Sequence, residues 1–329
     1  MAPPRRLSAV DQAWPLARPF AISRGMKTEA RVVVAEIEEG GHTGLGECVP
    51  YARYGETVEG VIHQIAELAD DIAGGLDRRG LLAALPPGAA RNALDCALWD
   101  LECKKAGRRA WDLAGLPEPQ PTVTAETISI GSPQEMAVQA ARLKAAPLLK
   151  VKLDGKDVRA RLGAVREAAP DARLIVDPNE GWDRHRLDNL LPFLADLGVE
   201  MIEQPVPAGT DETLRGLASP VPLCADESCH TVADLEALAG LYDMVNVKLD
   251  KAGGLTAALD LVAAAEQRGF AVMVGCMVAT SLAMAPATLL TARAAVVDLD
   301  GPLLLREDRA HGLDFTGRRI HPPVAALWG

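Results

Sequence analysis

Hydrophobic and polar residues change their spacing along the N-terminal part of the chain. Residues 30–37, ARVVVAEI, are rich in β-branched side chains and precede the turn Glu39-Gly40-Gly41. The piece GLGECVP follows, so we predict a β-hairpin. Helical spacing then begins, because apolar residues recur every three or four positions over about residues 56–73 and again over 89–106, before Gly107. Antiparallel strands followed by helices indicate a small α+β domain.

A second pattern begins after the proline-rich linker at residues 116–121. Amphipathic segments at 133–145, 158–168 and 256–267 separate short apolar runs from one another. The runs are TVTAETISI, LLKVKLD, ARLIVD, VEMIEQP, PLCADES, MVNVKLD, FAVMVGC and AAVVDLD. Eight strand-like runs with helical spacers predict an α/β fold, a parallel (β/α) TIM-type barrel. A doubly wound open sheet is the alternative, but no G-x-G-x-x-G turn follows the first run.

One uncharged stretch, residues 269–292, is long enough to raise the question of a membrane span. Its β-like start gives way to a segment with Thr280, Ser281 and Pro286, so we predict a buried strand followed by a buried helix. The N-terminus lacks a continuous apolar region, and we expect no signal peptide. Six scattered cysteines without a C-x-x-C pair are typical of reduced thiols and predict a cytoplasmic location.

Charge narrows the classes of partner. The chain has 34 basic and 45 acidic residues, a net charge of −11, with 49% hydrophobic residues. This acidic balance without a basic cluster argues against nucleic acid and against an anionic membrane surface as partners. A small anionic substrate stays compatible with it, because a bound divalent cation reverses the local sign.

Polar residues stand where the predicted barrel strands end, which is where barrel enzymes carry their catalytic groups. These residues, in chain order, are Lys150, Lys152, Asp177, Asn179, Glu203, Asp226, Glu227, Lys248, Asp250, Asp298 and Asp300. A lysine or carboxylate within an apolar run is unfavourable unless it is paired or functional. Simple salt bridges or solvated strand ends are the alternative explanation for any one of them.

The order of the strands predicts how these residues face each other. Lys152 and Lys248 end the second and sixth strands, which lie opposite each other in an eight-stranded ring. The three strands between them carry Asp177, Glu203 and Asp226, which would converge as oxygen ligands. Such a set suits Mg²⁺, with Mn²⁺ as a substitute, and the lack of His or Cys argues against zinc.

Abstraction of a proton next to a carboxylate needs this arrangement. The cation would stabilise the dianionic enediolate that forms. A lysine base must be neutral, so its pKa must fall from about 10.4, and we expect Lys150 and the metal ion to lower it. Two lysines on opposite faces would remove the proton from one side and return it from the other, which predicts racemisation or epimerisation.

These segments together resemble the enolase superfamily, specifically its muconate-lactonising subgroup, whose lysine bases and Mg²⁺ are a known pairing. The resembling pieces are KVKLD at 150–154, IVDPNEGW at 175–182, IEQP at 202–205, ADES at 225–228, NVKLDKAGG at 246–254 and ALDCALWDL at 93–101. The resemblance implies a modified TIM-type barrel over residues 119–313. It also implies an α+β capping domain over 1–118, to which 314–329 returns.

Several activities share the two lysines within this subgroup: cycloisomerases, o-succinylbenzoate synthases, N-acylamino acid racemases and dipeptide epimerases. The DLD segment resembles the Asp-x-Asp pair of dipeptide epimerases, which implies that Asp298 and Asp300 bind a free α-ammonium group. The implied substrate is L-Ala-L-Glu or L-Ala-D-Glu, in the recycling of murein (peptidoglycan) peptides. A non-catalytic protein that binds a metal ion or ligand is the alternative of another class, which the intact lysine pair disfavours.

Loops of the cap would carry substrate specificity. AISRG, with Arg24, resembles the loop in which an arginine of L-Ala-D/L-Glu epimerases pairs with the glutamate side chain, although a surface salt bridge is the alternative. CVPYARYGET resembles their second cap loop and makes Arg53 and Tyr54 further candidates. Thr127 on the first barrel strand is either a substrate contact or a buried core residue. A homo-oligomer is compatible with the sequence. The sequence does not indicate which lysine acts as the base for which stereoisomer.

Overall fold

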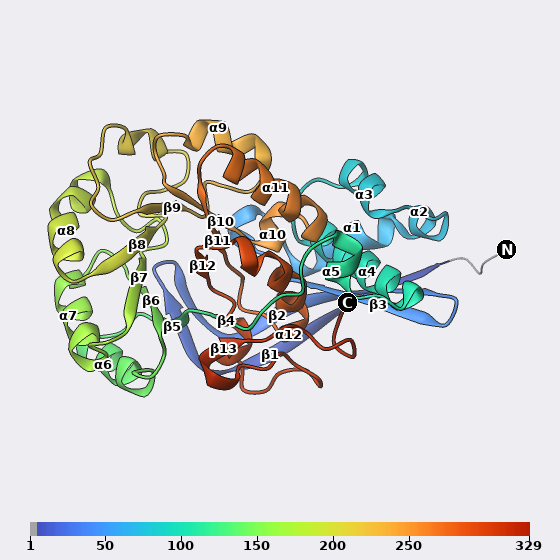
Figure 1. Ribbon diagram of the computed structural model, residues 1–329, viewed down its shortest axis with the longest axis horizontal. Helices are drawn as coiled ribbons and strands as arrows, with labels where there is room; N and C mark the ends of the chain where they lie inside the picture. Colours follow the sequence, from blue (N-terminus) through green and yellow to red (C-terminus); the bar gives the residue numbers. More distant parts are fainter. Residues whose placement is uncertain (1–4) are drawn as a thin grey trace.

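The computed structural model describes residues 5–329, and its N-terminal sheet has three antiparallel strands. They are β1 (Arg6–Ile22), β2 (Gly25–Glu39) and β3 (His42–Cys48), in the order β1-β2-β3. The predicted hairpin is β2 with β3, and β2 is longer than expected because it also pairs with β1. The pattern did not predict β1, an edge strand with mixed exposure whose register shifts between Pro15 and Phe20. The β1–β2 hairpin reaches from the cap to the barrel strands β5 and β6 (Figure 1).

Helices cover this sheet. They are α1 (Val58–Glu67), α2 (Ala69–Ala73), α3 (Arg78–Ala84), α4 (Ala89–Ala106) and α5 (Ala110–Ala114), with the 3₁₀ turn η1 (Ala52–Tyr54) before them. The range predicted for one helix, 56–73, holds two, because the backbone leaves helical geometry at Leu68. Helix α4 has the predicted limits and packs directly on β3. Gly44 and Gly46 permit this approach, since a Cβ on either would overlap the carbonyl oxygens of Ala97 or Ala93.

Eight parallel strands form the second sheet, as predicted. They are β5 (Glu126–Ile128), β6 (Leu148–Lys152), β7 (Arg173–Asp177), β8 (Val199–Glu203), β9 (Leu223–Ala225), β10 (Met244–Val247), β11 (Ala271–Val274) and β12 (Val296–Val297). The sheet curls so that its two ends meet. Ala125 N donates to Val297 O at 2.8 Å, and Leu299 N donates to Thr124 Oγ1 at 2.8 Å. The expected TIM-type barrel with an N-terminal cap is confirmed.

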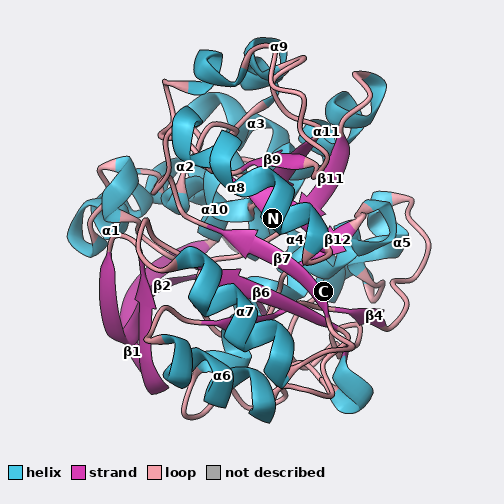
Figure 2. Ribbon diagram, turned by 90° about the vertical axis from the view of Figure 1, so that its left-hand side faces the viewer, coloured by secondary structure: helices cyan, strands magenta, loops and turns pink. Residues whose placement is uncertain are grey.

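Helices separate most of the barrel strands. Some of these spacers are short helices or 3₁₀ turns, so the fold departs from a regular (β/α) barrel. The spacers are α6 (Pro133–Arg142), α7 (Val158–Ala168), α8 (Arg184–Asp196), η2 (Asp211–Leu214), η3 (Val232–Asp234), α9 (Leu235–Leu238), α10 (Leu249–Ala252), α11 (Leu255–Gln267), α12 (Ser281–Ala287) and η4 (Thr288–Arg293). Helices α6 and α7 lie outside β6 and β7 (Figure 2). A single 3₁₀ turn stands between β8 and β9 where a full helix is usual.

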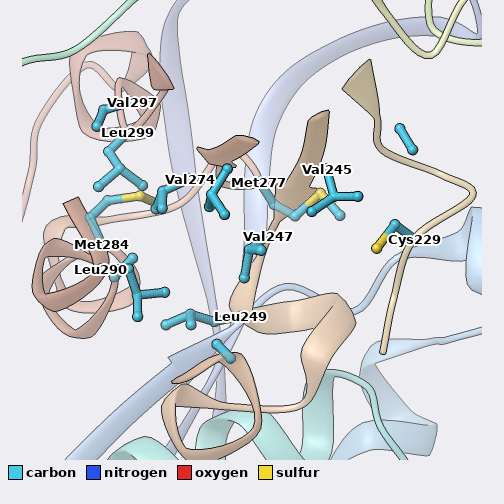
Figure 3. Close-up of a cluster of buried hydrophobic side chains, with 14 of the residues drawn as sticks. Cys229, Val245, Val247, Leu249, Val274, Met277, Met284, Leu290, Val297 and Leu299 are labelled. Carbon is cyan, nitrogen blue, oxygen red and sulfur yellow. The ribbon is translucent and has the colours of Figure 1, made fainter. Parts of the chain in front are cut away.

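The uncharged stretch at 269–292 is a buried strand followed by buried helical turns, β11, α12 and η4, as predicted. Within residues 5–329, every helix is too short or too polar to cross a membrane. Side chains of this stretch belong to the main apolar core. There Val274 and Met284 lie beside Val247 of β10 and Leu299 (Figure 3).

The last residues of the chain cross back to the N-terminal half. After η5 (Gly301–Leu304) and η6 (Thr316–Arg318), β13 (Arg319–Ile320) pairs with β4 (Thr122–Val123). Trp328 Nε1 donates to Cys96 O at 3.0 Å, and Gly329 N donates to Asp100 Oδ1 at 2.8 Å. Both acceptors belong to α4, so the C-terminus is tied to this central helix.

Candidate active site

The barrel strands build the site through the two-residue alternation of their side chains. One small apolar layer takes a residue from each strand or from the position just before it. Its members are Ala125, Leu148, Ile175, Met201, Cys224, Met244, Met273 and Val296. Two residues further along five of these strands stand Lys150, Asp177, Glu203, Asp226 and Asp298. Because residues two apart share a face, the polar groups lie on the inward face, directly above an apolar floor.

Ammonium and carboxylate groups alternate across this floor. Lys152 Nζ lies 2.5 Å from Asp177 Oδ2, which is 3.3 Å from Lys150 Nζ. Lys150 Nζ in turn lies 2.6 Å from Glu203 Oε2, and Glu203 Oε1 is 4.0 Å from Lys248 Nζ.

This row of alternating ammonium and carboxylate groups continues on the far side of the apolar layer. Lys248 Nζ lies 2.5 Å from Asp226 Oδ2, and Lys251 Nζ lies 2.7 Å from Asp226 Oδ1. Lys152 and Lys248 are thus separated by the carboxylates, as the strand order predicts. All of these side chains are buried.

The charges in this row shift the pKa values of its members. Burial alone would favour the neutral amine of Lys150, but Asp298, Glu203 and Asp177 outweigh it and raise the pKa well above its usual value. Asp226 likewise outweighs burial and raises the pKa of Lys248. Lys150 lowers the pKa of Lys248, which is the direction expected of it, but Asp226 and Glu203 outweigh both Lys150 and burial.

Three of the carboxylates are the predicted metal ligands. Asp177, Glu203 and Asp226 are 0–1% exposed and come from adjacent strand ends. Within the described chain, 5–329, no three His, Cys, Asp or Glu side chains stand close enough to form a ready metal cage, since lysines lie between these carboxylates. The donor set nevertheless fits a hard cation. All its donors are oxygens, and Glu203 Oε2 has no aligned hydrogen bond despite its 2.6 Å ion-pair contact.

Buried polar residues that the sequence did not single out hold these carboxylates in place. Gln204 Oε1 accepts hydrogen bonds from Asp226 N at 2.8 Å and from Ser228 N at 3.1 Å. Asn246 Nδ2 donates to Glu203 Oε1 at 2.8 Å. Lys251 donates to Asp226 Oδ1 and to the carbonyls of Asp226 and Asn246. The sequence could have indicated these three residues, because Gln204 lies in the segment IEQP and Asn246 and Lys251 lie in NVKLDKAGG.

A cavity of about 550 Å³ opens above the row. Its lining includes the predicted residues Lys150, Lys152, Asp226, Lys248, Asp298, Asp300, Thr127, Arg24, Arg53 and Tyr54. The barrel lysines and the cap-loop residues therefore share one space. Asp177 and Glu203 lie beneath the lining.

The two aspartates of the DLD segment have different partners. Asp298 Oδ2 lies 2.7 Å from Lys150 Nζ, whereas Asp300 Oδ2 accepts a hydrogen bond from Thr127 N at 2.7 Å. Thr127 is half-buried at the cavity wall and makes this contact through its backbone N–H. Burial, followed by the charge of Asp298, raises the pKa of Asp300 to about 7.

Arg24 occupies the turn of the β1–β2 hairpin and bonds to the barrel loops. Its Nη1 lies 3.0 Å from Glu180 Oε2, and its Nη2 lies 2.7 Å from Glu227 Oε1. Arg53 also pairs with Glu180, at 2.8 Å. In this structure Arg24 therefore forms salt bridges within the protein, which was the alternative to a contact with the substrate. Asn179 and Glu180 have φ values of 44° and 67°, a strained backbone typical of functional loops.

The second cap loop brings aromatic rings to the cavity. The rings of Tyr51 and Tyr54 meet edge to face with centroids 5.1 Å apart, and Tyr54 meets His230 at 4.5 Å. Tyr51 hydroxyl accepts a hydrogen bond from Arg24 Nη2 at 3.1 Å. Neither Tyr51 nor Glu180 was predicted, because Tyr51 reaches the cavity and Glu180 meets Arg24 and Arg53 only through the docking of the cap.

The two-domain architecture and the lysine–carboxylate row define a class, barrel enzymes of the enolase type with a separate cap. Residues 5–115 match the N-terminal domain of the mandelate racemase and muconate lactonizing enzyme family, and residues 135–324 match the enolase C-terminal domain-like family. The chain belongs to this mandelate racemase and muconate lactonizing enzyme family of the enolase superfamily.

Two relatives are similar over nearly their whole length. The chain is 49% identical over 319 residues to the L-Ala-D/L-Glu epimerase of Escherichia coli K12, covering 96% of this chain and 99% of that protein. It is 46% identical over 300 residues to an N-acetyl-D-glutamate racemase of a Pseudoalteromonas species, covering 91% and 94%.

Two solved structures resemble the fold closely. An enolase family member from Agrobacterium tumefaciens, with bound sodium and L-Ala-L-Glu, has a TM-score of 0.97 at 51% identity and covers 99% of this chain and 100% of that one. A dipeptide epimerase from Cytophaga hutchinsonii, with Mg and D-Ala-L-Val, has a TM-score of 0.92 at 29% identity, covering 98% and 94%.

Proposed function

We propose that this protein is a Mg²⁺-dependent dipeptide epimerase that inverts the α-carbon of the C-terminal residue of L-Ala-L-Glu or L-Ala-D-Glu. The observation that carries the proposal is the single cavity lined by Lys152, Lys248, Asp298 and Asp300. Two lysines on opposite sides suit a reaction that takes a proton from one face and returns one to the other. Two further carboxylates suit a substrate with a free amine.

Lys152 and Lys248 are the acid/base pair of this proposal. Each would act as the base for one stereoisomer, while the other, as an ammonium, delivers a proton to the opposite face. Asp177 and Asp226 hold the two ammonium groups at 2.5 Å, so each lysine is aimed by its own carboxylate. Lys150, paired with Glu203 and Asp298, is a supporting cation between them.

Asp177, Glu203 and Asp226 would hold the Mg²⁺ ion, for which Mn²⁺ is a proposed substitute. When bound, the ion neutralises negative charge that develops on the substrate carboxylate as the α-proton leaves. Relatives of this fold bind Mg together with a dipeptide, as in the Cytophaga hutchinsonii structure. The buried, all-oxygen donor set supports the same choice here.

Asp298 and Asp300 would receive the α-ammonium group of the N-terminal residue. Asp300 has a backbone N–H as its hydrogen-bond partner and no ion pair within residues 5–329, so its charge is available to a cation. An anionic substrate without an amine, such as that of an o-succinylbenzoate synthase or cycloisomerase, would meet two repelling carboxylates. This favours a dipeptide over those alternatives.

The test is incubation of L-Ala-L-Glu in D₂O with Mg²⁺, following deuterium at the glutamate α-carbon by NMR. We expect exchange and the appearance of L-Ala-D-Glu. A folded, Mg²⁺-loaded protein that exchanges no α-proton would contradict the proposal. L-Ala-D-Glu as the starting material provides the reverse reaction.

N-acetylglutamate is the competing substrate to include, because the Pseudoalteromonas relative is an N-acetyl-D-glutamate racemase. Its acetyl group carries no positive charge for Asp298 and Asp300. We therefore expect the dipeptide to have the higher kcat/KM. The opposite order would favour the N-acylamino acid racemase alternative.

A further inference from the structure

Most charged side chains that line the cavity are already paired within the protein. Six cationic residues line it: Arg24, Lys27, Arg53, Lys150, Lys152 and Lys248. Five of these form ion pairs with carboxylates of the barrel, at N–O distances of 2.5 to 2.8 Å. A charge held this way is available to a substrate only after a protein carboxylate loses its partner.

Lys27 is the exception among the cations that line the cavity. Within residues 5–329 it takes part in no ion pair, and its side chain is exposed near the start of β2. Its Nζ lies 5.2 Å from the ring centroid of Tyr51, a weak cation–π contact. Because Tyr51 hydroxyl accepts a hydrogen bond from Arg24, the ring on which Lys27 rests is held by the hairpin turn.

The acidic residues of the cavity lining likewise divide into those with an ion-pair partner and one without. Asp226, Glu227 and Asp298 pair with lysine or arginine, whereas Asp300 has the backbone N–H of Thr127 as its partner. Among residues 5–329, the cavity lining therefore has one ammonium group and one carboxyl group without an ion-pair partner. Asp300 belongs to the barrel wall and Lys27 to the cap hairpin.

We propose that Lys27 binds the side-chain carboxylate of an acidic C-terminal residue and sets the preference for acidic over neutral dipeptides. The inference rests on the proposed function and names a specificity residue for it. A dipeptide with its amine at Asp300 and an acidic side chain toward the cap matches the two unpaired charges.

Arg24 is less available for this role because two glutamates already hold it. Glu227 is 2% exposed in its side chain and has Arg24 as its ion-pair partner. Drawing Arg24 away toward a substrate would leave that buried carboxylate unpaired, which is strongly unfavourable. Lys27 exchanges only water and the face of an aromatic ring for the substrate carboxylate.

The size of the effect follows from the exposure of Lys27. An exposed ion pair changes an equilibrium by roughly two- to fivefold at low salt. Salt screens such a pair over distances of about 10 Å, so the effect shrinks as salt is added. A charge reversal at this position doubles the change in charge and enlarges the effect.

The experiment measures kcat/KM for L-Ala-L-Glu and L-Ala-L-Gln by α-proton exchange in D₂O with Mg²⁺, at low and high salt. We expect the acidic-to-neutral ratio to fall about two- to fivefold in Lys27→Gln and further in Lys27→Glu, while Lys27→Arg retains it. Lys144→Gln removes an equal charge from an exposed lysine outside the cavity and should keep the ratio of the unaltered protein. High salt should narrow the difference.

Two results would overturn the assignment while leaving the proposed function in place. One is an unchanged ratio in both Lys27→Gln and Lys27→Glu, with exchange intact. The other is an equal fall in Lys144→Gln, which would indicate a general charge effect. If the unaltered protein exchanges neither dipeptide, the proposed function fails and the role of Lys27 fails with it.

Discussion

The ammonium group of Lys150, in the middle of β6, lies 2.7 Å from Oδ2 of Asp298, which follows β12 on the other side of β5. The same ammonium is 2.6 Å from Glu203 Oε2. One buried lysine thus connects a carboxylate of the proposed metal site to a carboxylate of the proposed amine site. Changes at Asp298 should therefore affect both the substrate and the charge row.

Replacing Asp298 with Asn should weaken the use of substrates that have a free amine. Removal of one member of a buried, hydrogen-bonded charge pair costs about 2–5 kcal/mol, which is roughly thirtyfold or more. We expect kcat/KM for L-Ala-L-Glu to fall by about that factor, with a smaller fall for N-acetylglutamate, measured by α-proton exchange. Equal losses on both substrates would contradict a role in binding the amine.

Substitution of each lysine separately tests the two-base mechanism. Loss of a general acid or base lowers a rate by about 10²–10⁴-fold. Lys152→Ala and Lys248→Ala should each lose epimerisation by about that amount, yet keep α-proton exchange from one diastereomer, a different one in each variant. Mass spectrometry after incubation in D₂O measures this. Full two-way epimerisation by either variant would exclude the mechanism.

Mg²⁺ should stabilise the folded protein through the carboxylate set. A ligand at a hundred times its Kd contributes about 2.7 kcal/mol, so thermal unfolding should shift upward when MgCl₂ is added. Glu203→Gln should reduce this shift. Glu200→Gln is the matched control, since Glu200 lies on the same strand but pairs with Arg173 at the surface. An identical shift in Glu203→Gln would place the ion elsewhere.

Asp95 should make stability depend on pH in a defined direction. Its carboxylate accepts hydrogen bonds from Thr256 N and Oγ1 at 2.9 and 2.6 Å, and burial raises its pKa to about 6 from 3.8. The folded state therefore holds the proton more tightly. The protonated Asp95 therefore contributes fully to the free energy of unfolding below pH 3.8, and this contribution is lost as the pH rises through about 6.

Asp95→Asn keeps the shape and removes this titration. Relative to the unaltered protein, the variant should gain up to about 3 kcal/mol between pH 4 and pH 7, from roughly two pKa units. Urea unfolding at several pH values measures the difference. Asp70→Asn, at an exposed carboxylate of α2, is the control. A pH-independent difference for Asp95→Asn would contradict the prediction.

Two glycines should respond to alanine in opposite directions. A Cβ on Gly46 would overlap Ala93 O of α4, so Gly46→Ala should destabilise the cap by about 1–3 kcal/mol. Gly163 in α7 has no atom within 4 Å of its Cβ position, and alanine there should stabilise by about 1 kcal/mol. Denaturant unfolding of both variants measures this, and a neutral Gly46→Ala would refute the close approach of β3 and α4.

The sequence alone determined the barrel and the order of its polar strand ends. Short apolar runs and amphipathic spacers are local patterns, and strand order places Lys152 opposite Lys248 without any coordinates. The limits of α4 and of α7 also followed from local periodicity. These features depend on residues close together in the chain, which is why a pattern along the chain reveals them.

Only the tertiary structure decided how the charges pair. Lys150 meets Asp298 across 148 positions, and Arg24 meets Glu227 across 203, so no local pattern carries these contacts. Packing brought Tyr51 and Lys27 to the cavity because the β1–β2 hairpin docks on the barrel loops. The raised pKa of Lys248 likewise depends on the carboxylate of Asp226, 2.5 Å away at the end of the neighbouring strand, a distance that arises only when β9 and β10 pair.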